Sequence, residues 1–275
     1  MKHVISFLNT MMLILILSGG LLLASTVHSV LSISSTTEQK TAREEEIIIP
    51  TADLPTVGMY INFKKPVPED LFYVADGYKN GGTFNCLWDK EMSSLYNSKL
   101  TLRLESIESK WHCAEYATTV LFHYGLYEAS LKAPSQHGVV TFFGTFAANG
   151  DEIDMEFNGS KPGEVELNYW SRGRITAHTI IQLGFDVSEG YHTYAFDWKP
   201  IGIDWYIDKK LVWTNVFANY GAKVDTPSPI VMNIWAANKS LGDGWLGGYL
   251  DAANPPRKNI EASFEWIRFT PFKSE

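Results

Sequence analysis

The segment of residues 151–157, Asp-Glu-Ile-Asp-Met-Glu-Phe, constrains the fold more than any other stretch, because carboxylates alternate in it with apolar side chains. Successive side chains of a β-strand point to opposite faces. Glu152, Asp154 and Glu156 therefore share one face, and the three apolar side chains share the other. The segment predicts a strand with one face in a core and the other face toward water.

Three like charges on one face repel one another, so the triplet requires a reason. Glycoside hydrolysis with retention supplies one, because it uses a nucleophilic carboxylate and an acid/base carboxyl about 5 to 5.5 Å apart. The Cα atoms of Glu152 and Glu156 lie roughly 13 Å apart on a strand, so their side chains have to lean toward each other. Asp154 between them would keep one carboxyl ionised and the other protonated. Taken alone, the motif favours a simpler alternative, an acidic and solvent-facing hairpin.

Composition narrows the class of protein. The 275 residues are 45% hydrophobic and 13% aromatic, which is typical of a globular chain with a large core. The nine Trp, thirteen Tyr and fifteen Phe suit a carbohydrate cleft and a β-sandwich core equally. The net charge of −8 and the lack of a Lys/Arg run argue against nucleic acid as a partner.

The N-terminus carries a targeting signal. A basic start at Met1-Lys2-His3 precedes an apolar run and then small residues, which predicts a signal peptide over residues 1–29. An uncleaved membrane anchor is the alternative, but polar residues interrupt the run, so we expect removal and no stable membrane association afterwards. Residues 30–56 are rich in Ser, Thr and Glu and predict a polar linker. We therefore expect a secreted protein, extracellular or periplasmic, whose only two cysteines, Cys86 and Cys113, pair.

From residue 57 onward, short runs with a β pattern recur between turn signals, and no long amphipathic helix period is present. Asn149-Gly150 and Asp208-Lys209 are two of the turn signals. The pattern predicts one all-β domain, residues 57–275, built of two packed antiparallel sheets. The predicted strands are residues 100–104, 116–122, 126–131, 139–146, 164–170, 179–183, 192–198, 203–207, 210–214, 230–234 and 263–269.

The segment of residues 151–157 resembles the catalytic motif of glycoside hydrolase family 16, and its uninterrupted spacing resembles the bacterial lichenase branch. Other segments between Asp76 and Phe269 resemble lichenase segments in the same order. They are residues 76–81, 84–86, 113–116, 124–128, 168–170, 190–198 and 232–235.

This resemblance implies a curved β-jelly roll with a substrate groove on its concave face. It implies Glu152 as nucleophile, Glu156 as general acid and then base, and Asp154 as an assisting carboxylate. The expected activity is that of a secreted, retaining endo-β-glucanase acting on mixed-linkage β-1,3-1,4-glucan or a related polysaccharide. No cofactor is expected to take part in the reaction.

Other positions match the family one at a time. Glu115 matches a cleft acid, Asn168 a polar contact near the nucleophile, and Trp170 stands where relatives have Tyr. For Phe84 and Trp235, plain core packing is the alternative. The substrate-binding residues implied are Tyr78, Asn80, Phe84, Glu115, Asn168, Trp170, Asn233 and Trp235.

Two further features follow from the resemblance. Cys86 and Cys113 occupy the positions of the family's disulfide. Glu265 stands where some relatives hold a structural calcium with an Asp, so the resemblance implies a calcium site there, with a longer side chain.

The sequence departs from the lichenase pattern at two cleft positions, where Ala117 replaces an Arg and Gly150 replaces a Trp. Another β-glucan or an exopolysaccharide therefore stays open as substrate. A transglycosylase of the same family is a second alternative, and Asn158-Gly159-Ser160 is a glycosylation signal of the kind that some of those enzymes carry. A binding protein without activity is poorly supported, because all three carboxylates are present.

Overall fold

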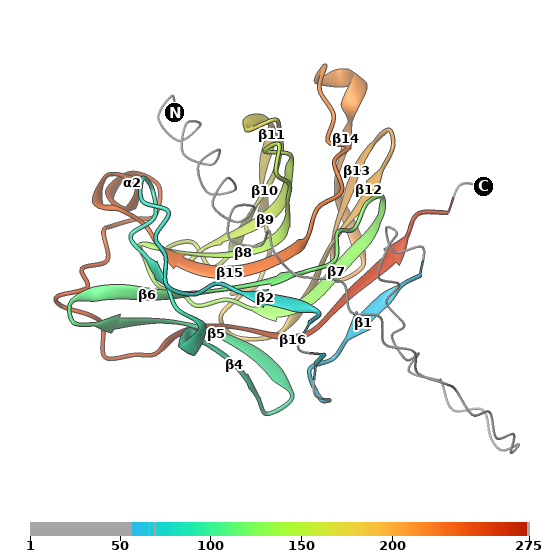
Figure 1. Ribbon diagram of the computed structural model, residues 1–275. Coiled ribbons are helices and arrows are strands. Elements are labelled where there is room, and N and C mark those ends of the chain that lie inside the picture. Colours follow the sequence, from blue (N-terminus) through green and yellow to red (C-terminus); the bar gives the residue numbers. More distant parts are fainter. Residues whose placement is uncertain (1–56, 66, 69, 274–275) are drawn as a thin grey trace, which may run out of the picture.

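The computed structural model describes residues 57–65, 67–68 and 70–273. The predicted signal peptide and linker lie outside the described residues. The strands join in one 16-stranded sheet that folds over itself into two curved layers (Figure 1). The fold is thus the all-β jelly roll that the sequence predicts.

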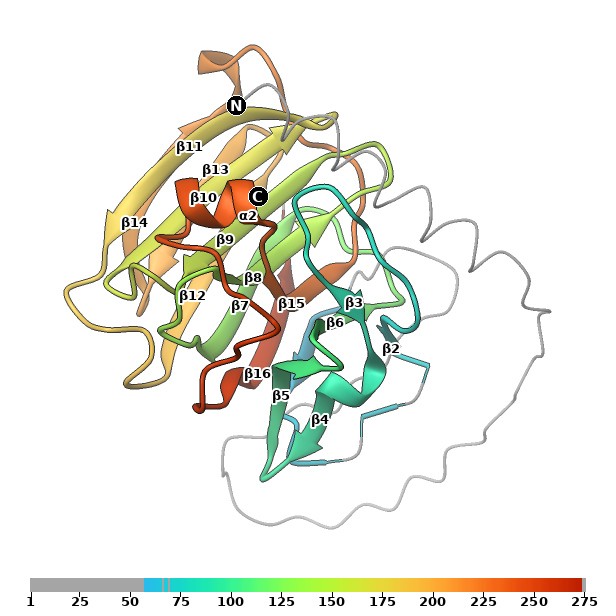
Figure 2. The ribbon, with the colours of Figure 1, turned by 90° about the vertical axis from the view of Figure 1, so that its left-hand side faces the viewer.

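The inner layer forms a bowl, and its strands lie side by side in the view of Figure 2. In spatial order it contains β11 (Arg174–Gln182), β10 (Glu164–Ser171), β9 (Glu152–Asn158), β8 (Val139–Phe146), β15 (Ile230–Ala236), β6 (Lys110–Thr118) and β2 (Phe72–Val74).

The outer layer continues the same hydrogen-bonded path. It contains β5 (Lys99–Ile107), β16 (Ile260–Pro271), β7 (Gly125–Lys132), β12 (His192–Lys199), β13 (Gly202–Ile207) and β14 (Lys210–Val216), with β1 (Met59–Ile61) on β16 and β4 (Ser93–Tyr96) on β5. The pairing of β5 with β6 joins the two layers. The short β3 (Leu87–Trp88) pairs with β6 in parallel, whereas the other described strand pairs are antiparallel.

Positive φ angles close several hairpins. Asp208 and Lys209 have φ of 48° and 66°, and they connect β13 to β14. Two successive residues with positive φ form the turn whose twist matches that of paired strands. The predicted strand at residues 116–122 is wrong in extent, because β6 already ends at Thr118, whose hydroxyl donates to the Val120 carbonyl at 2.8 Å.

The core fills the space between the layers. The apolar face of β9 contributes Ile153, Met155 and Phe157, each at most 1% exposed. Phe157 contacts Tyr194 of β12 with ring centroids 4.7 Å apart. Each such buried side chain stabilises the fold by about 1.5 to 3 kcal/mol. The other face of β9 is therefore free to carry polar groups into the bowl.

Helices are short in the part of the chain that the structure describes. They are η1 (Lys90–Met92), η2 (Phe217–Asn219) and α2 (Lys239–Gly244). The Asn238 side chain caps α2 by accepting from the Leu241 amide at 2.9 Å. Over these same residues, no helix has the length and apolar character needed to cross a membrane.

Candidate active site

The face of β9 that points away from the core carries the three predicted carboxylates, but this face is largely buried and not turned toward water as predicted. Glu152 is 6% exposed and Asp154 is 1% exposed, while Glu156 is half-buried. Asp154 lies opposite Gly144 of β8, where an added Cβ would meet the Ile153 carbonyl oxygen at 2.2 Å. The missing side chain lets β8 and β9 pair at this point.

Strand β10 supplies a bridge between two of the carboxylates. Asn168 is 3% exposed and lies opposite Asp154. Its amide Nδ2 donates to Asp154 Oδ1 at 2.7 Å and to Glu156 Oε2 at 3.2 Å. The structure thus places Asn168 against Asp154 and Glu156, and places Trp170 directly opposite Glu152.

Burial raises the pKa values of Glu152, Asp154 and Glu156 well above their usual range. Repulsion between the carboxylates adds to this effect. The charge of Glu156 raises the pKa of Glu152, the charge of Glu152 raises the pKa of Asp154, and the charge of Asp154 raises the pKa of Glu156. Hydrogen bonds from Asn168 act in the opposite direction on Asp154 and Glu156. Such a cluster retains protons at a pH at which free carboxyls have lost them, which general acid catalysis at neutral pH requires.

A fourth carboxylate beside these three, Glu166, was not predicted from the sequence. It is 6% exposed and lies opposite Glu156 on β10. Trp245 Nε1 donates to Glu166 Oε1 at 2.6 Å, and His178 Nε2 lies 3.2 Å from Oε2. The alternation of residues 164–170 could have found it, because Glu166 shares a face with Asn168 and Trp170.

Glu115 and Asn233 meet on the neighbouring strands β6 and β15. Glu115 is 1% exposed and Asn233 is 4% exposed, and Asn233 Nδ2 donates to Glu115 Oε2 at 3.1 Å. Burial raises the pKa of Glu115 to about 7, although the Asn233 hydrogen bond lowers it. Unlike an ordinary surface acid, Glu115 can therefore carry a proton near neutral pH.

Of the remaining predicted residues, Tyr78, Asn80 and Phe84 lie in the loop between β2 and β3, and Trp235 lies on β15. The Phe84 and Trp235 rings lie 4.6 Å apart at 48°. Burial and then the Glu115 charge raise the pKa of Tyr78.

Five buried polar atoms of predicted site residues lack a hydrogen-bond partner among the described residues. They are the Tyr78 hydroxyl, Asn80 Nδ2, Asn80 Oδ1, Asp154 Oδ2 and Asn233 Oδ1. Buried polar groups are normally paired, so these groups are ready to bind the hydroxyl groups of a ligand.

The two positions that depart from the lichenase pattern, Ala117 and Gly150, lie in buried or crowded surroundings. Ala117 belongs to a small buried cluster on the floor of the bowl, separate from the main core, and a Cβ added at Gly150 would meet the Gly173 amide nitrogen at 2.6 Å. A larger residue therefore does not fit at 150. The cluster consists of Ala117, Phe142, Phe146 and Val231.

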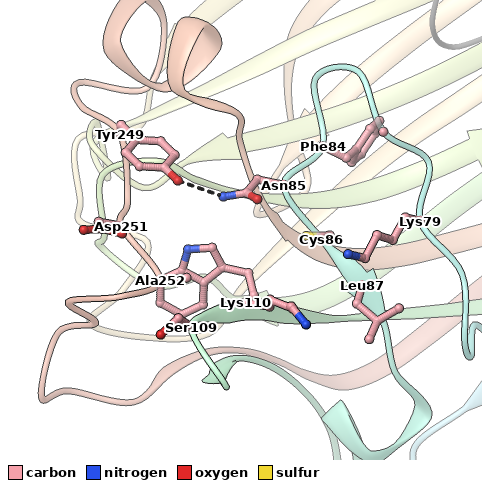
Figure 3. A pocket seen from close by; sticks show the side chains of 12 residues that line it. Lys79, Phe84, Asn85, Cys86, Leu87, Ser109, Lys110, Tyr249, Asp251 and Ala252 are labelled. Atoms are coloured by element: carbon pink, nitrogen blue, oxygen red, sulfur yellow. Dashed lines mark hydrogen bonds between the residues drawn. The ribbon is translucent and has the colours of Figure 1, made fainter.

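A small pocket of about 160 Å³ is lined in part by Phe84 (Figure 3). Asn85 and Tyr249 face each other across it, and Asn85 Nδ2 donates to the Tyr249 hydroxyl at 3.3 Å. The ammonium groups of Lys79 and Lys110 border the same pocket. None of the predicted catalytic residues lines this pocket.

The predicted disulfide is confirmed, because Cys86 and Cys113 are bonded across a sequence separation of 27. It ties β3 and its preceding loop to β6. The glycosylation signal does not present an exposed acceptor. Asn158 is only 3% exposed, and its Nδ2 donates to the Trp245 carbonyl at 3.0 Å.

The surroundings of Glu265 do not fit calcium. Ser130 Oγ donates to Glu265 at 2.9 Å, and the Lys99 ammonium lies 3.9 Å from the same carboxylate. Calcium requires six to eight oxygen ligands, and a lysine at this distance repels a cation. Within the described residues, no group of three or more His, Cys, Asp or Glu could hold a metal.

Comparison with known proteins gives the same family at the levels of sequence and structure. The profile of glycosyl hydrolases family 16 matches residues 80–257. A β-glucanase of Paenibacillus macerans is 43% identical over 203 residues, covering 71% of this chain and 81% of that protein. A β-glucanase of Bacillus subtilis is 36% identical over 228 residues, covering 80% of this chain and 89% of that protein.

Among solved structures, the Bacillus licheniformis β-glucanase matches with a TM-score of 0.72 and 34% identity. That match covers 78% of this chain and 99% of the other. The residue pattern of β9, the jelly roll and these matches lead to one conclusion: the chain belongs to glycoside hydrolase family 16.

Proposed function

We propose that the protein is a retaining endo-β-glucanase, which hydrolyses internal bonds of mixed-linkage β-1,3-1,4-glucan or a related β-glucan. The observation that carries the proposal is the row of Glu152, Asp154 and Glu156 on one face of β9, with pKa values raised by burial. The names of the bacterial relatives, which are β-glucanases, support the substrate class.

In the proposed reaction, Glu156 donates its proton to the glycosidic oxygen while the ionised Glu152 attacks the anomeric carbon. The leaving sugar departs with that proton, and a covalent glycosyl-enzyme remains. Glu156, now ionised, then takes a proton from water, whose oxygen releases the sugar from Glu152. Asn168 holds Asp154 and Glu156 in a fixed relation during both steps.

The remaining predicted residues suit binding of the sugar chain. Flat rings stack on the apolar faces of sugars, and the partly exposed Phe84 and Trp170 provide them, whereas Trp235 is buried in the core against Phe84. Amides and carboxylates bind hydroxyl groups, and Tyr78, Asn80, Glu115 and Asn233 provide polar groups.

A screen of reducing-end release over lichenan, laminarin, xyloglucan, agarose and κ-carrageenan tests the substrate. We expect release from lichenan by the parent protein and none by Glu152→Gln. Products longer than the donor, formed when an oligosaccharide acceptor is added, would instead identify a transglycosylase. Saturable glucan binding without new reducing ends would contradict the enzyme proposal.

We also propose that the protein is exported and that its reaction needs no cofactor. The apolar N-terminal run and the disulfide support export, because disulfides persist in oxidising compartments. Sequencing the N-terminus of protein recovered from the culture fluid or periplasm tests it, and an intact Met1 would contradict removal of the leader. If the reaction needs no metal cofactor, treatment with a chelator should leave the activity unchanged.

A further inference from the structure

Glu166 is not used in the proposed reaction, although it lies beside the catalytic carboxylates. It is paired in register with Glu156 across β10 and β9. Residues opposite each other in an antiparallel pair have Cβ atoms about 4.5 to 5.5 Å apart, on the same face. Two acids so placed repel each other, and such a pair is kept only where the repulsion is compensated or used.

The contacts of Glu166 hold both of its oxygens. Trp245 Nε1 lies 2.6 Å from Oε1, and His178 Nε2 lies 3.2 Å from Oε2. Trp245 directly follows α2, and Figure 2 shows α2 in front of β9 and β10. An indole N–H can only donate, so Glu166 Oε1 is the acceptor of this hydrogen bond.

The groups that face Glu166 come from three elements. Glu156 and Asp154 face it from β9, His178 from β11, and Trp245 from the end of α2. In the described chain, neither a lysine nor an arginine pairs with Glu166. Its charge therefore acts mainly on the carboxyls of β9.

We propose that Glu166 is a positioning residue for the acid/base, a fixed negative charge that keeps Glu156 protonated until the glycosidic oxygen takes the proton. This inference depends on the proposed function of Glu156 as general acid. The electrostatics agree in direction, because the Glu166 charge adds to burial and Asp154 in raising the pKa of Glu156. It also adds to burial and Glu152 in raising the pKa of Asp154.

A pair of variants separates charge from shape. Glu166→Gln keeps the size and the acceptor for Trp245 but removes the charge, whereas Glu166→Asp keeps the charge and shortens the reach. We expect the alkaline limb of the kcat/KM profile, where Glu156 loses its proton, to fall by about one pH unit in Glu166→Gln. The limb should stay near the parent position in Glu166→Asp.

Glu164→Gln is the matched control, since Glu164 lies two residues away on the same face of β10 and contacts Lys161 and Gln182. Its profile should match the parent. A limb that stays in place in Glu166→Gln but moves in Glu166→Asp would show a role in shape alone and would overturn the proposal.

Titration of the Glu156 carboxyl by ¹³C NMR, in a Glu152→Gln background, repeats the test without substrate. Glu166→Gln should lower the Glu156 titration midpoint by about one pH unit. An unchanged midpoint would overturn the inference even in an active enzyme. A lowered midpoint in a protein that hydrolyses no β-glucan would contradict the proposed function and leave the coupling established.

Discussion

Ionisation is costly for the acidic side chains of the bowl, because burial removes the water that stabilises their charge. Glu115 shows the effect most simply, since it lies on β6 with one hydrogen-bond donor, Asn233. Each buried acid with a raised pKa makes the folded protein bind a proton more tightly than the unfolded chain does. Stability must then fall as the pH rises through the window between the two pKa values.

Glu115→Gln should flatten this dependence. The parent group titrates at about 7 when folded and at about 4.5 when free, so its contribution to the free energy of unfolding declines between these pH values. Gln keeps the acceptor for Asn233 and has no charge to bury. We expect the variant to gain about 3 kcal/mol over the parent between about pH 4 and about pH 8. Urea unfolding at both pH values measures it.

The exposed Glu105→Gln is the control for a general loss of charge. It should follow the parent curve at both pH values. If Glu115→Gln followed the parent curve too, the raised pKa of Glu115 would be wrong.

At this scale the sequence predicted which residues line the bowl but not how they contact one another. Alternation placed Glu152, Asp154 and Glu156 on one face, and the structure confirms it. It did not show that Asn168 bridges Asp154 and Glu156, because the register of β10 on β9 is not written in either strand alone.

Strand pairing decides which side chains become neighbours in the bowl. The β8–β9 pair has one close contact of this kind, because the backbone of Ile153 and Asp154 passes over Gly144. A Cβ at 144 would meet the Ile153 carbonyl oxygen at 2.2 Å and Asp154 Cα at 2.8 Å. Neither atom can move without moving the strand.

Gly144→Ala should therefore force β8 and β9 apart. We expect a loss of on the order of 1 to 3 kcal/mol in the free energy of unfolding, as for other overpacked sites. We also expect a loss of activity of about a hundredfold, since a shift of about 1 Å at Asp154 is enough for that. Thermal unfolding and reducing-end assays measure the two effects.

Gly163→Ala is the matched control. Its added Cβ would have no neighbour closer than 3.9 Å, so both measurements should match the parent. Equal behaviour of the two variants would contradict the tight contact at Gly144.

Elements were predicted well where the apolar pattern is long and poorly where tertiary contacts set the ends. The predicted strand at residues 139–146 coincides with β8. In contrast, β6 begins at Lys110 and pairs with the two-residue β3 in parallel. A strand of two residues has no period to detect, so the sequence could not reveal it.

For the whole molecule, the disulfide joins the Phe84 loop to the inner layer. Cys86 and Cys113 are buried, and the bond closes a loop across a sequence separation of 27. By the chain-entropy estimate, such a loop stabilises the fold by about 3.5 kcal/mol.

Replacing both cysteines by alanine should lower the free energy of unfolding by about that amount while the jelly roll still forms. Equilibrium unfolding in urea measures the loss. Thiol titration of the unfolded, unreduced parent is the companion measurement. Two reactive thiols in that titration would contradict the disulfide.

Azide rescue tests most directly whether the carboxylates of β9 form the catalytic centre. Azide can fill the space left in Glu152→Gly and attack an aryl β-glucan oligosaccharide, which gives an α-glycosyl azide. In Glu156→Gly it instead attacks the glycosyl-enzyme and gives the β-glycosyl azide. We predict these two products, identified by ¹H NMR, from variants that are otherwise inactive. Exchanged anomers, or parental turnover in either variant without azide, would contradict the assignment of Glu152 as nucleophile and Glu156 as acid/base.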